Sequence, residues 1–207
     1  MSFLTGTQVE CLYTMPASGA ATTAAVATVM SGTTAANPPY LLPGGFFAPQ
    51  CGTMPGKSLL IKGGGSWATP TATRTTNFKI GFNTTAGTGT PAILLGSTGT
   101  LTTAITTATG AWDFELLVTC TVQGSAAGGG SLNAVGWVEY GIANNAATGT
   151  FATYGNNNAQ RFLIGTPQTP VTFTTTTAYY VECSNTWDAT TNAPTITLTN
   201  FYVFGLN

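Results

Sequence analysis

The titratable side chains of this 207-residue chain are few, and they restrict the chemistry that it can perform. It has six carboxylates, five basic side chains and four cysteines, and no histidine, the commonest general base. Asp113 and Glu115 are two residues apart in an alternating run, so they should share one face of a strand. Paired carboxylates can hydrolyse glycosides, but these are also the solvent positions of an amphipathic strand. We interpret them as solvated and predict that the chain is not an enzyme.

The cysteines are interpreted as reduced thiols. Cys11, Cys51, Cys120 and Cys183 form no C-x-x-C pair, and the start of the chain lacks the positive end and apolar run of a signal peptide. We therefore expect synthesis in a cytoplasm, with neither zinc nor any other metal or cofactor bound. Cys120 and Cys183 fall on apolar strand faces and should be buried, whereas Cys11 and Cys51 should be more accessible.

A polar stretch over residues 185–192 is the candidate ligand-binding loop, with Asn185, Trp187 and Asp188 as its candidate residues. Its oxygen atoms could hold Ca²⁺, although one carboxylate is a weak donor set for calcium and such stretches are commonly turns. An exposed Trp187, Tyr154 or Trp67 could stack on a sugar ring. Packing in a core or an interface is the more common role of tryptophan.

The low charge of the chain points to an assembly. Charged residues make up 5% of the sequence and the formal net charge is −1, against about a quarter charged in an ordinary soluble domain. A free particle of this composition has little electrostatic repulsion to oppose association. The five basic residues form no cluster, and no stretch has the length of a membrane helix, so we expect neither nucleic acid nor membrane as a partner.

From residue 57 onward, apolar and polar side chains alternate as in half-buried strands. The clearest run predicts one inward face made of Trp112, Phe114, Leu116, Val118, Cys120 and Val122. Two further runs place Phe78, Ile80 and Phe82, and Tyr179, Val181 and Cys183, inward. Strands are predicted over 58–62, 76–82, 91–95, 112–123, 134–142, 160–164, 170–174, 178–183 and 194–206. Eight or nine strands separated by polar turns predict an all-β fold with a closed or sandwiched antiparallel sheet, and we take the sandwich as the prediction.

Residues 1–56 differ from residues 57–207 and are predicted to form an N-terminal arm. The segment is rich in Ala, Gly and Pro and lacks strand alternation, so it should contribute little to the core. A helix over residues 20–30 is possible by composition, but interspersed threonines favour an extended arm that anchors the protein or joins subunits. Removal of residues 1–32 should then leave a folded β domain.

The last strand is apolar on both faces. Ile196 and Leu198 define one face, but from residue 201 onward Phe201 and Val203 lie on one side and Tyr202 and Phe204 on the other. One sandwich has one core, so the second face should be covered by another copy of the chain or by the N-terminal arm. We predict a homotrimer with Phe201 and Val203 at its interface.

Three stretches within residues 56–207 carry a resemblance to a known class. They are GKSLLIKGGG at 56–65, WDFELLVT at 112–119 and ITLTNFYVFG at 196–205. The pattern resembles bacteriophage virion proteins with a trimeric jelly-roll domain of the tumour-necrosis-factor type, which phages use as capsid decoration proteins, head fibres and tail knobs. The resemblance consists of strand pattern and composition, so it transfers no functional residue. It implies a jelly-roll connection of the strands.

Together these features predict a structural virion protein. The first hypothesis is a capsid decoration, or cement, protein made in a host cytoplasm, which binds the head shell as a trimer through residues 1–56. Its partners would be itself and the major capsid protein or another virion protein. The alternative is a tail or fibre protein that recognises a host surface polysaccharide through loop aromatics and amides, and the two differ in location on the particle.

Overall fold

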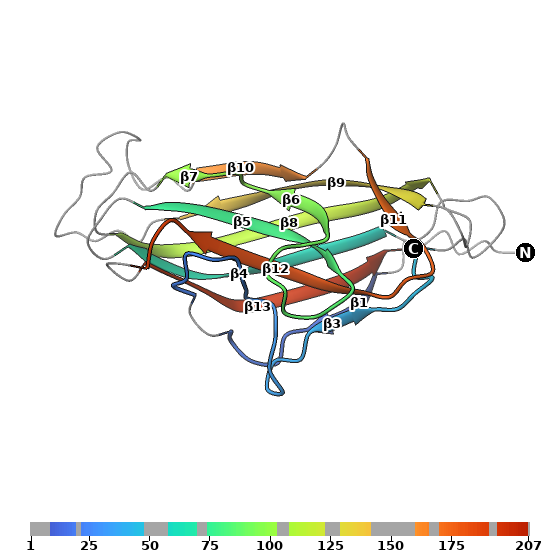
Figure 1. Cartoon of the computed structure of the whole chain (residues 1–207), viewed down its shortest axis with the longest axis horizontal. Helices are drawn as coiled ribbons and strands as arrows, with labels where there is room; N and C mark the ends of the chain where they lie inside the picture. The colour runs from blue at the N-terminus through green and yellow to red at the C-terminus, as the bar shows by residue number, and fades with distance from the viewer. Residues whose placement is uncertain are drawn as a thin grey trace, which may run out of the picture.

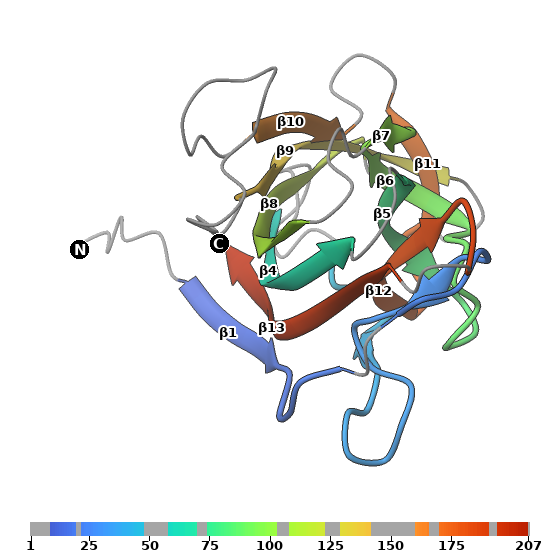
Figure 2. The same ribbon diagram turned by 90° about the vertical axis from the view of Figure 1, so that its left-hand side faces the viewer.

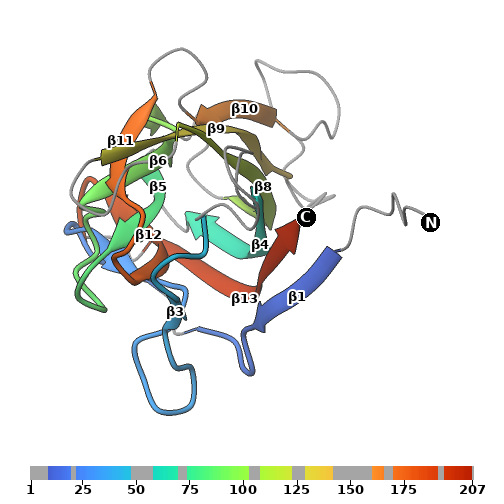
Figure 3. The same ribbon diagram turned by 90° about the vertical axis from the view of Figure 1, so that its right-hand side faces the viewer.

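The chain folds as two antiparallel β-sheets packed face to face, an all-β sandwich. The computed structural model describes residues 9–19, 22–47, 58–69, 74–102, 108–122, 129–141, 160–165, 170–190 and 194–206. Figure 1 shows the sheets lying over one another along the long axis, and Figures 2 and 3 show them from the ends, enclosing the core.

The larger sheet has seven strands in the order β1-β13-β4-β8-β9-β10, with β11 also paired to β9. Its strands are β1 (Val9–Thr14), β4 (Ser58–Thr69), β8 (Ala108–Val122), β9 (Gly129–Tyr140), β10 (Gln160–Gly165), β11 (Val171–Thr174) and β13 (Thr195–Leu206). The smaller sheet has the order β2-β12-β5-β6, with β3 paired to β12 and β7 to β5. Its strands are β2 (Thr28–Val29), β3 (Tyr40–Leu42), β5 (Thr75–Asn83), β6 (Ile93–Ser97), β7 (Leu101–Thr102) and β12 (Tyr179–Trp187).

All nine strands predicted from the sequence are present, as β4, β5, β6 and β8 to β13. The inward faces are also confirmed: the predicted residues of β5 and β12 are buried, as are five of the six in β8. The exception is Val122, which is 55% exposed because a bulge between Cys120 and Val122 shifts the pairing of β8 with β9. An extra residue in one strand reverses the faces that follow it.

A second bulge changes the phase of β13. The pairing with β4 slips between Leu198 and Asn200, so Ile196 and Leu198 are followed on the inward face by Phe201 and Val203. Glycine occupies positions 63 to 65 of β4 opposite this irregularity. A Cβ atom at Gly65 would overlap the carbonyl oxygen of Thr197, so a larger residue cannot be accommodated without movement of the backbone.

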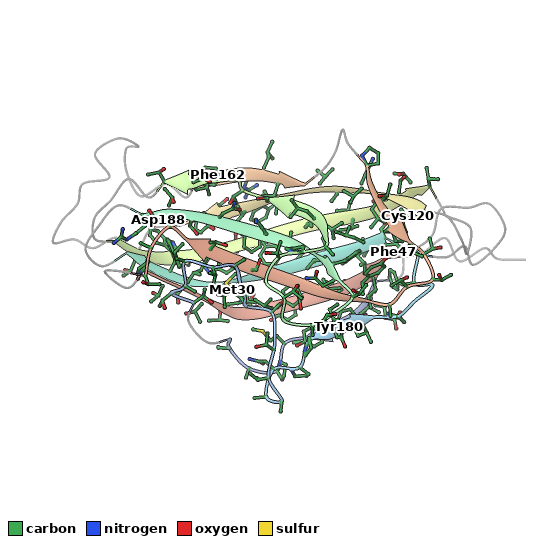
Figure 4. All side chains as sticks on the ribbon, in the orientation of Figure 1. Met30, Phe47, Cys120, Phe162, Tyr180 and Asp188 are labelled. Atoms are coloured by element: carbon green, nitrogen blue, oxygen red, sulfur yellow. The ribbon has the colours of Figure 1, made fainter. Side chains whose placement is uncertain are left out.

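The prediction that residues 1–56 contribute little to the core is wrong for the described part of that segment. Residues 9–47 supply β1 to the larger sheet and β2 and β3 to the smaller one, and no helix forms in the described part of 20–30. The segment also contributes Met15, Met30, Leu42 and Phe47 to the core. It is extended, but it lies along the sandwich, because its scattered large side chains find places between the sheets. Figure 4 shows Met30 and Phe47 among the packed side chains.

Candidate interaction surface

The candidate ligand loop does not form as predicted. β12 continues to Trp187, so the amide of Asn185 points into the core and its Oδ1 accepts a hydrogen bond of 2.7 Å from the hydroxyl of Thr76. Trp187 is buried, and its Nε1 donates to the carbonyl oxygen of Thr22 at 3.1 Å. Only Asp188 is exposed, at one end of the sandwich (Figure 4). Two of the three residues are therefore core residues, and the prediction of a shared ligand site is wrong for them.

The structure describes one of the two other candidate sugar-stacking residues, Trp67. Trp67 is buried, and its Nε1 donates to the carbonyl oxygen of Gly141 at 3.0 Å. Its ring meets Tyr140 edge-on, with 6.3 Å between the ring centres. Tyr154 lies outside the described residues, as does Cys51. Trp67 thus has the packing role that is the more common one for tryptophan.

Phe201 and Val203 lie in the core of their own chain, where each is 0% exposed. Side chains buried in this way are unavailable to a neighbouring copy, so their prediction as trimer-interface residues is wrong. The cause is the bulge in β13, which strict alternation counted from Ile196 does not anticipate. It is Tyr202 and Phe204 that face outward, with their rings stacked 6.1 Å apart.

The outer face of the larger sheet holds a continuous apolar row. Backbone pairing places Phe204 beside Leu60, Leu60 beside Leu117 and Leu117 beside Val135, so the row crosses four strands. Leu117 is 40% exposed and Val135 is 55% exposed. We define the outer apolar face as Leu60, Leu117, Val135, Leu163, Tyr202 and Phe204. Leu163 and Tyr202 belong to the adjacent row, and Leu163 is 85% exposed.

Four charged side chains of this face form two ion pairs. Lys62 Nζ lies 2.6 Å from Glu115 Oε2, and Arg161 Nε lies 2.8 Å from Glu139 Oε2. The guanidinium of Arg161 also covers the ring of Trp137, 4.1 Å from its centre, which is cation–π geometry. The predicted carboxylate pair, Asp113 and Glu115, thus lies on a sheet surface that carries both signs of charge. The two side chains stand in neighbouring rows that run across the strands.

Asp113 is the carboxylate with the most unfavourable surroundings on this face. It lies directly across from Glu139 in the pairing of β8 with β9. Partial desolvation raises its pKa above the ordinary value, and the negative charge of Glu139 raises the pKa further, while the positive charge of Arg161 opposes both effects. These are the directions expected for a carboxylate beside a like charge.

Sequence reasoning missed one buried carboxylate, that of Glu182 on β12. Alternation placed Glu182 at a solvent position, but the connection between β5 and β6 covers it and leaves it 1% exposed. Its two oxygens accept hydrogen bonds from Asn83 Nδ2 at 2.6 Å and from the backbone N–H of Gly87 at 2.5 Å. Asn83 Oδ1 in turn accepts from the N–H of Ala92 at 2.7 Å. The carboxylate therefore fastens this connection to the sheet, and no sequence signal marked it.

The connection between β2 and β3 projects away from both sheets (Figures 2 and 3). Its tip, residues 33–36, is exposed and consists of two threonines and two alanines. Its base is held by the buried side chain of Asn37, whose Oδ1 accepts from the N–H of Ala17 at 3.0 Å and whose Nδ2 donates to the carbonyl of Ser18 at 3.1 Å. The hydroxyl of Tyr13 adds a 2.7 Å hydrogen bond to the carbonyl of Pro38. These hydrogen bonds hold the projection in a defined conformation.

No protein-family model, curated protein or solved structure matches this chain. Within the described ranges, no group of three or more acidic, cysteine or histidine side chains is placed to hold a metal ion. In the same part of the chain, no helix has the length and hydropathy that a membrane crossing requires.

Proposed function

We propose that this chain is a structural virion protein of a bacteriophage, specifically a capsid decoration protein that binds the head shell as a homotrimer. The observation that carries the proposal is the outer apolar face, which none of the described segments covers, on a chain with only 5% charged residues. Surfaces of this kind are typical of proteins that act through contact with other proteins.

The β-sandwich supports the finer parts of the proposal. The chain crosses between the two sheets after β1, β3, β4, β7, β11 and β12, and repeated crossing of this kind is a feature of jelly-roll connections. The sequence resembles the trimeric jelly-roll proteins of phage virions. A protein of that class acts as a component of the assembled particle. Fold alone would not distinguish a head protein from a tail protein.

Attachment to the shell is assigned to residues 1–56. Within the described part of this segment, the projection between β2 and β3 has the geometry of a contact element. Its small side chains allow close approach of another backbone, and the hydrogen bonds of Asn37 hold it in place before binding. A preformed contact loses less conformational entropy on binding than a segment that must first become ordered. Three copies in one trimer would further strengthen attachment through multivalency.

The test is reconstitution on particles that lack the protein. Virions are prepared after deletion of the gene for this chain, and purified protein is added and separated from the particles by sedimentation. Particles that bind it are then imaged by electron cryomicroscopy. We expect added density in many copies over the head. Density confined to the tail would instead support the receptor-binding alternative, and no bound protein would contradict both.

A variant with Thr33, Ala35 and Ala36 replaced by serine or glutamate identifies the attachment element, and Thr34 is kept because its hydroxyl accepts a hydrogen bond of 3.1 Å from the N–H of Asn37. Serine changes size little and preserves neutrality and serves as the control, whereas three carboxylates add bulk and charge to the tip. We expect the glutamate variant to lose head binding and the serine variant to retain it. If both bind alike, attachment occurs elsewhere on the molecule.

A further inference from the structure

No segment within the described residues covers the outer apolar face. Of the eight large hydrophobic side chains that are exposed in the described part of the chain, Val9, Leu117, Val135 and Leu163 all lie on the outer side of the larger sheet. The N-terminal segment does not shield them, because β1 extends the sheet at its edge beside β13. The alternative cover expected from the sequence is therefore absent over the described ranges.

The charge on this face favours a partner of the same composition. Its two basic and two of its acidic side chains already form the pairs Lys62–Glu115 and Arg161–Glu139. A strongly charged partner such as nucleic acid would find few free counter-charges. Further copies of the same chain bring the same apolar row and both signs of charge, and each adds only one described carboxylate of this face, Asp113, that is outside these two pairs, so association leaves little excess of either sign.

The outer apolar face is broad enough to meet two neighbouring copies. Five strands, β13, β4, β8, β9 and β10, form it, and at about 4.8 Å per strand they span roughly 24 Å. Seven residues along β13, from Asn200 to Leu206, span about 24 Å in the other direction. Around a three-fold axis the flat area of about 580 Å² is shared between two neighbours, and edge residues must add to each contact to reach the roughly 800 Å² per partner of a standard interface.

We propose that copies of this chain associate through the outer apolar face, which replaces Phe201 and Val203 as the subunit interface of the trimer. This inference rests on the homotrimer in the proposed function and adds the surface that forms it. Leu117 lies between Leu60 and Val135 in the apolar row, and Leu163 is the most exposed member of the adjacent row. Central apolar side chains dominate the energetics of such contacts.

The test compares three lysine variants of the full chain. Leu117→Lys and Leu163→Lys place a charge on the face, and Leu94→Lys on β6 is the matched control, since Leu94 is 39% exposed and Leu117 is 40% exposed. Leu163→Lys also guards against misfolding, because its side chain is 85% exposed in the single chain. Molar mass is measured by light scattering after size exclusion, and dissociation constants by analytical ultracentrifugation.

We expect the unaltered chain and Leu94→Lys to give about three chain masses of 21.1 kDa. Leu117→Lys and Leu163→Lys should weaken association at least 100-fold and run as monomers with unchanged far-ultraviolet circular dichroism. A trimer that persists in both face variants overturns this interface and leaves the head-binding proposal standing. A monomeric unaltered chain whose head binding is lost in Leu117→Lys assigns the face to the shell protein instead, and also overturns the inference.

Discussion

Asn37 is the residue on which the projection between β2 and β3 depends. Its buried amide accepts a hydrogen bond from the N–H of Ala17 and donates one to the carbonyl of Ser18. An unsatisfied buried polar group costs about 1–3 kcal/mol. We expect Asn37→Ala to lower the free energy of unfolding by about 2–4 kcal/mol in urea titrations. Thr33→Ala, at the exposed tip, is the control and should change it by less than about 0.5 kcal/mol.

Asp113 gives a prediction about pH. Because desolvation and Glu139 raise its pKa in the folded state above 3.8, the folded protein binds a proton more readily than the unfolded chain does. Deprotonation of Asp113 as pH rises through the raised pKa therefore destabilises the fold. Asp113→Asn should increase the free energy of unfolding at pH 7, by less than about 1 kcal/mol because solvent screens this exposed group. Urea titrations at pH 7 and pH 3 should show the gain shrinking at the lower pH.

Glu115→Gln is the matched control for that measurement. It neutralises a carboxylate on the same strand, but one that lies 2.6 Å from Lys62 Nζ. Removing a favourable partner should leave stability unchanged or slightly lower at pH 7. A gain from Glu115→Gln equal to that from Asp113→Asn would point to general charge repulsion in place of the Asp113–Glu139 contact.

The cysteines should differ strongly in reactivity. Cys11 is exposed on the edge strand β1, whereas Cys183 is fully buried and burial raises the pKa of its thiol well above the ordinary value. Burial also raises the pKa of Cys120. Thiolate is the reactive form, so alkylation of the native protein should label Cys11 first, with Cys120 and Cys183 slower by about 100-fold or more. Mass spectrometry of chymotryptic peptides measures each rate, and labelling of Cys183 as fast as Cys11 would contradict the packing of β12.

At the scale of elements, the sequence was a good guide wherever alternation was unbroken. β5, β8 and β12 were located, with the inward faces of β5 and β12 and most of that of β8, because a half-buried strand must alternate. Bulges are set by packing between strands, so the outward turn of Val122 and the inward turn of Phe201 could not be read from one strand alone. The alternation within one strand also does not predict which distant segments of the chain will cover it. Glu182, for example, is buried beneath the connection between β5 and β6.

The N-terminal strands were missed because β2 and β3 have only two and three residues, and because β1 shows no clear alternation of apolar and polar side chains. Their strand state is imposed by neighbours: β1 by β13, and β2 and β3 by β12. Context of this kind overrides local propensity in β-sheets. The expectation that a chain without residues 1–32 would remain a folded domain must therefore be revised.

Deletion of residues 1–32 should destabilise the sandwich. It removes β1 and β2, uncovers the edges of β13 and β12, and takes Met15 and Met30 out of the core. Losing two buried methionines alone costs about 4 kcal/mol or more, which is a large share of the stability of an ordinary domain. We expect the melting temperature, followed by circular dichroism, to fall by more than 10 °C, on the basis that each 1 kcal/mol shifts it by about 2–4 °C.

Deletion of residues 1–8 is the control, because it removes none of the described strands. Its melting temperature should stay within a few degrees of that of the full chain. If the longer deletion also melts cooperatively within that range, β1 and β2 are dispensable, and the segment is an arm after all.

At the scale of the whole molecule, three features support the same proposal of an assembled state. They are the low charge, the core between the two sheets and the outer apolar face. The core uses the inward faces of both sheets, and the outward face of the larger sheet carries a second apolar surface that a monomer would leave in water. A soluble monomer is normally protected from association by surface charge. This chain has 5% charged residues and pairs most of those on the large sheet with one another, which is consistent with a surface covered in the assembled state.

The proposed trimer should respond to salt in a way that follows from this distribution of charge. If the ion pairs lie within each copy and apolar side chains form the contact between copies, screening should matter little to association. Raising sodium chloride from 0.1 to 1 M shortens the Debye length from about 10 Å to 3 Å, which weakens charge pairs between exposed groups. We expect the dissociation constant of the proposed trimer, measured by analytical ultracentrifugation, to change by less than about threefold over this range. Ammonium sulfate should tighten association, because sulfate strengthens apolar burial. A tenfold or greater weakening in sodium chloride would instead show that charges of one copy pair with those of the next.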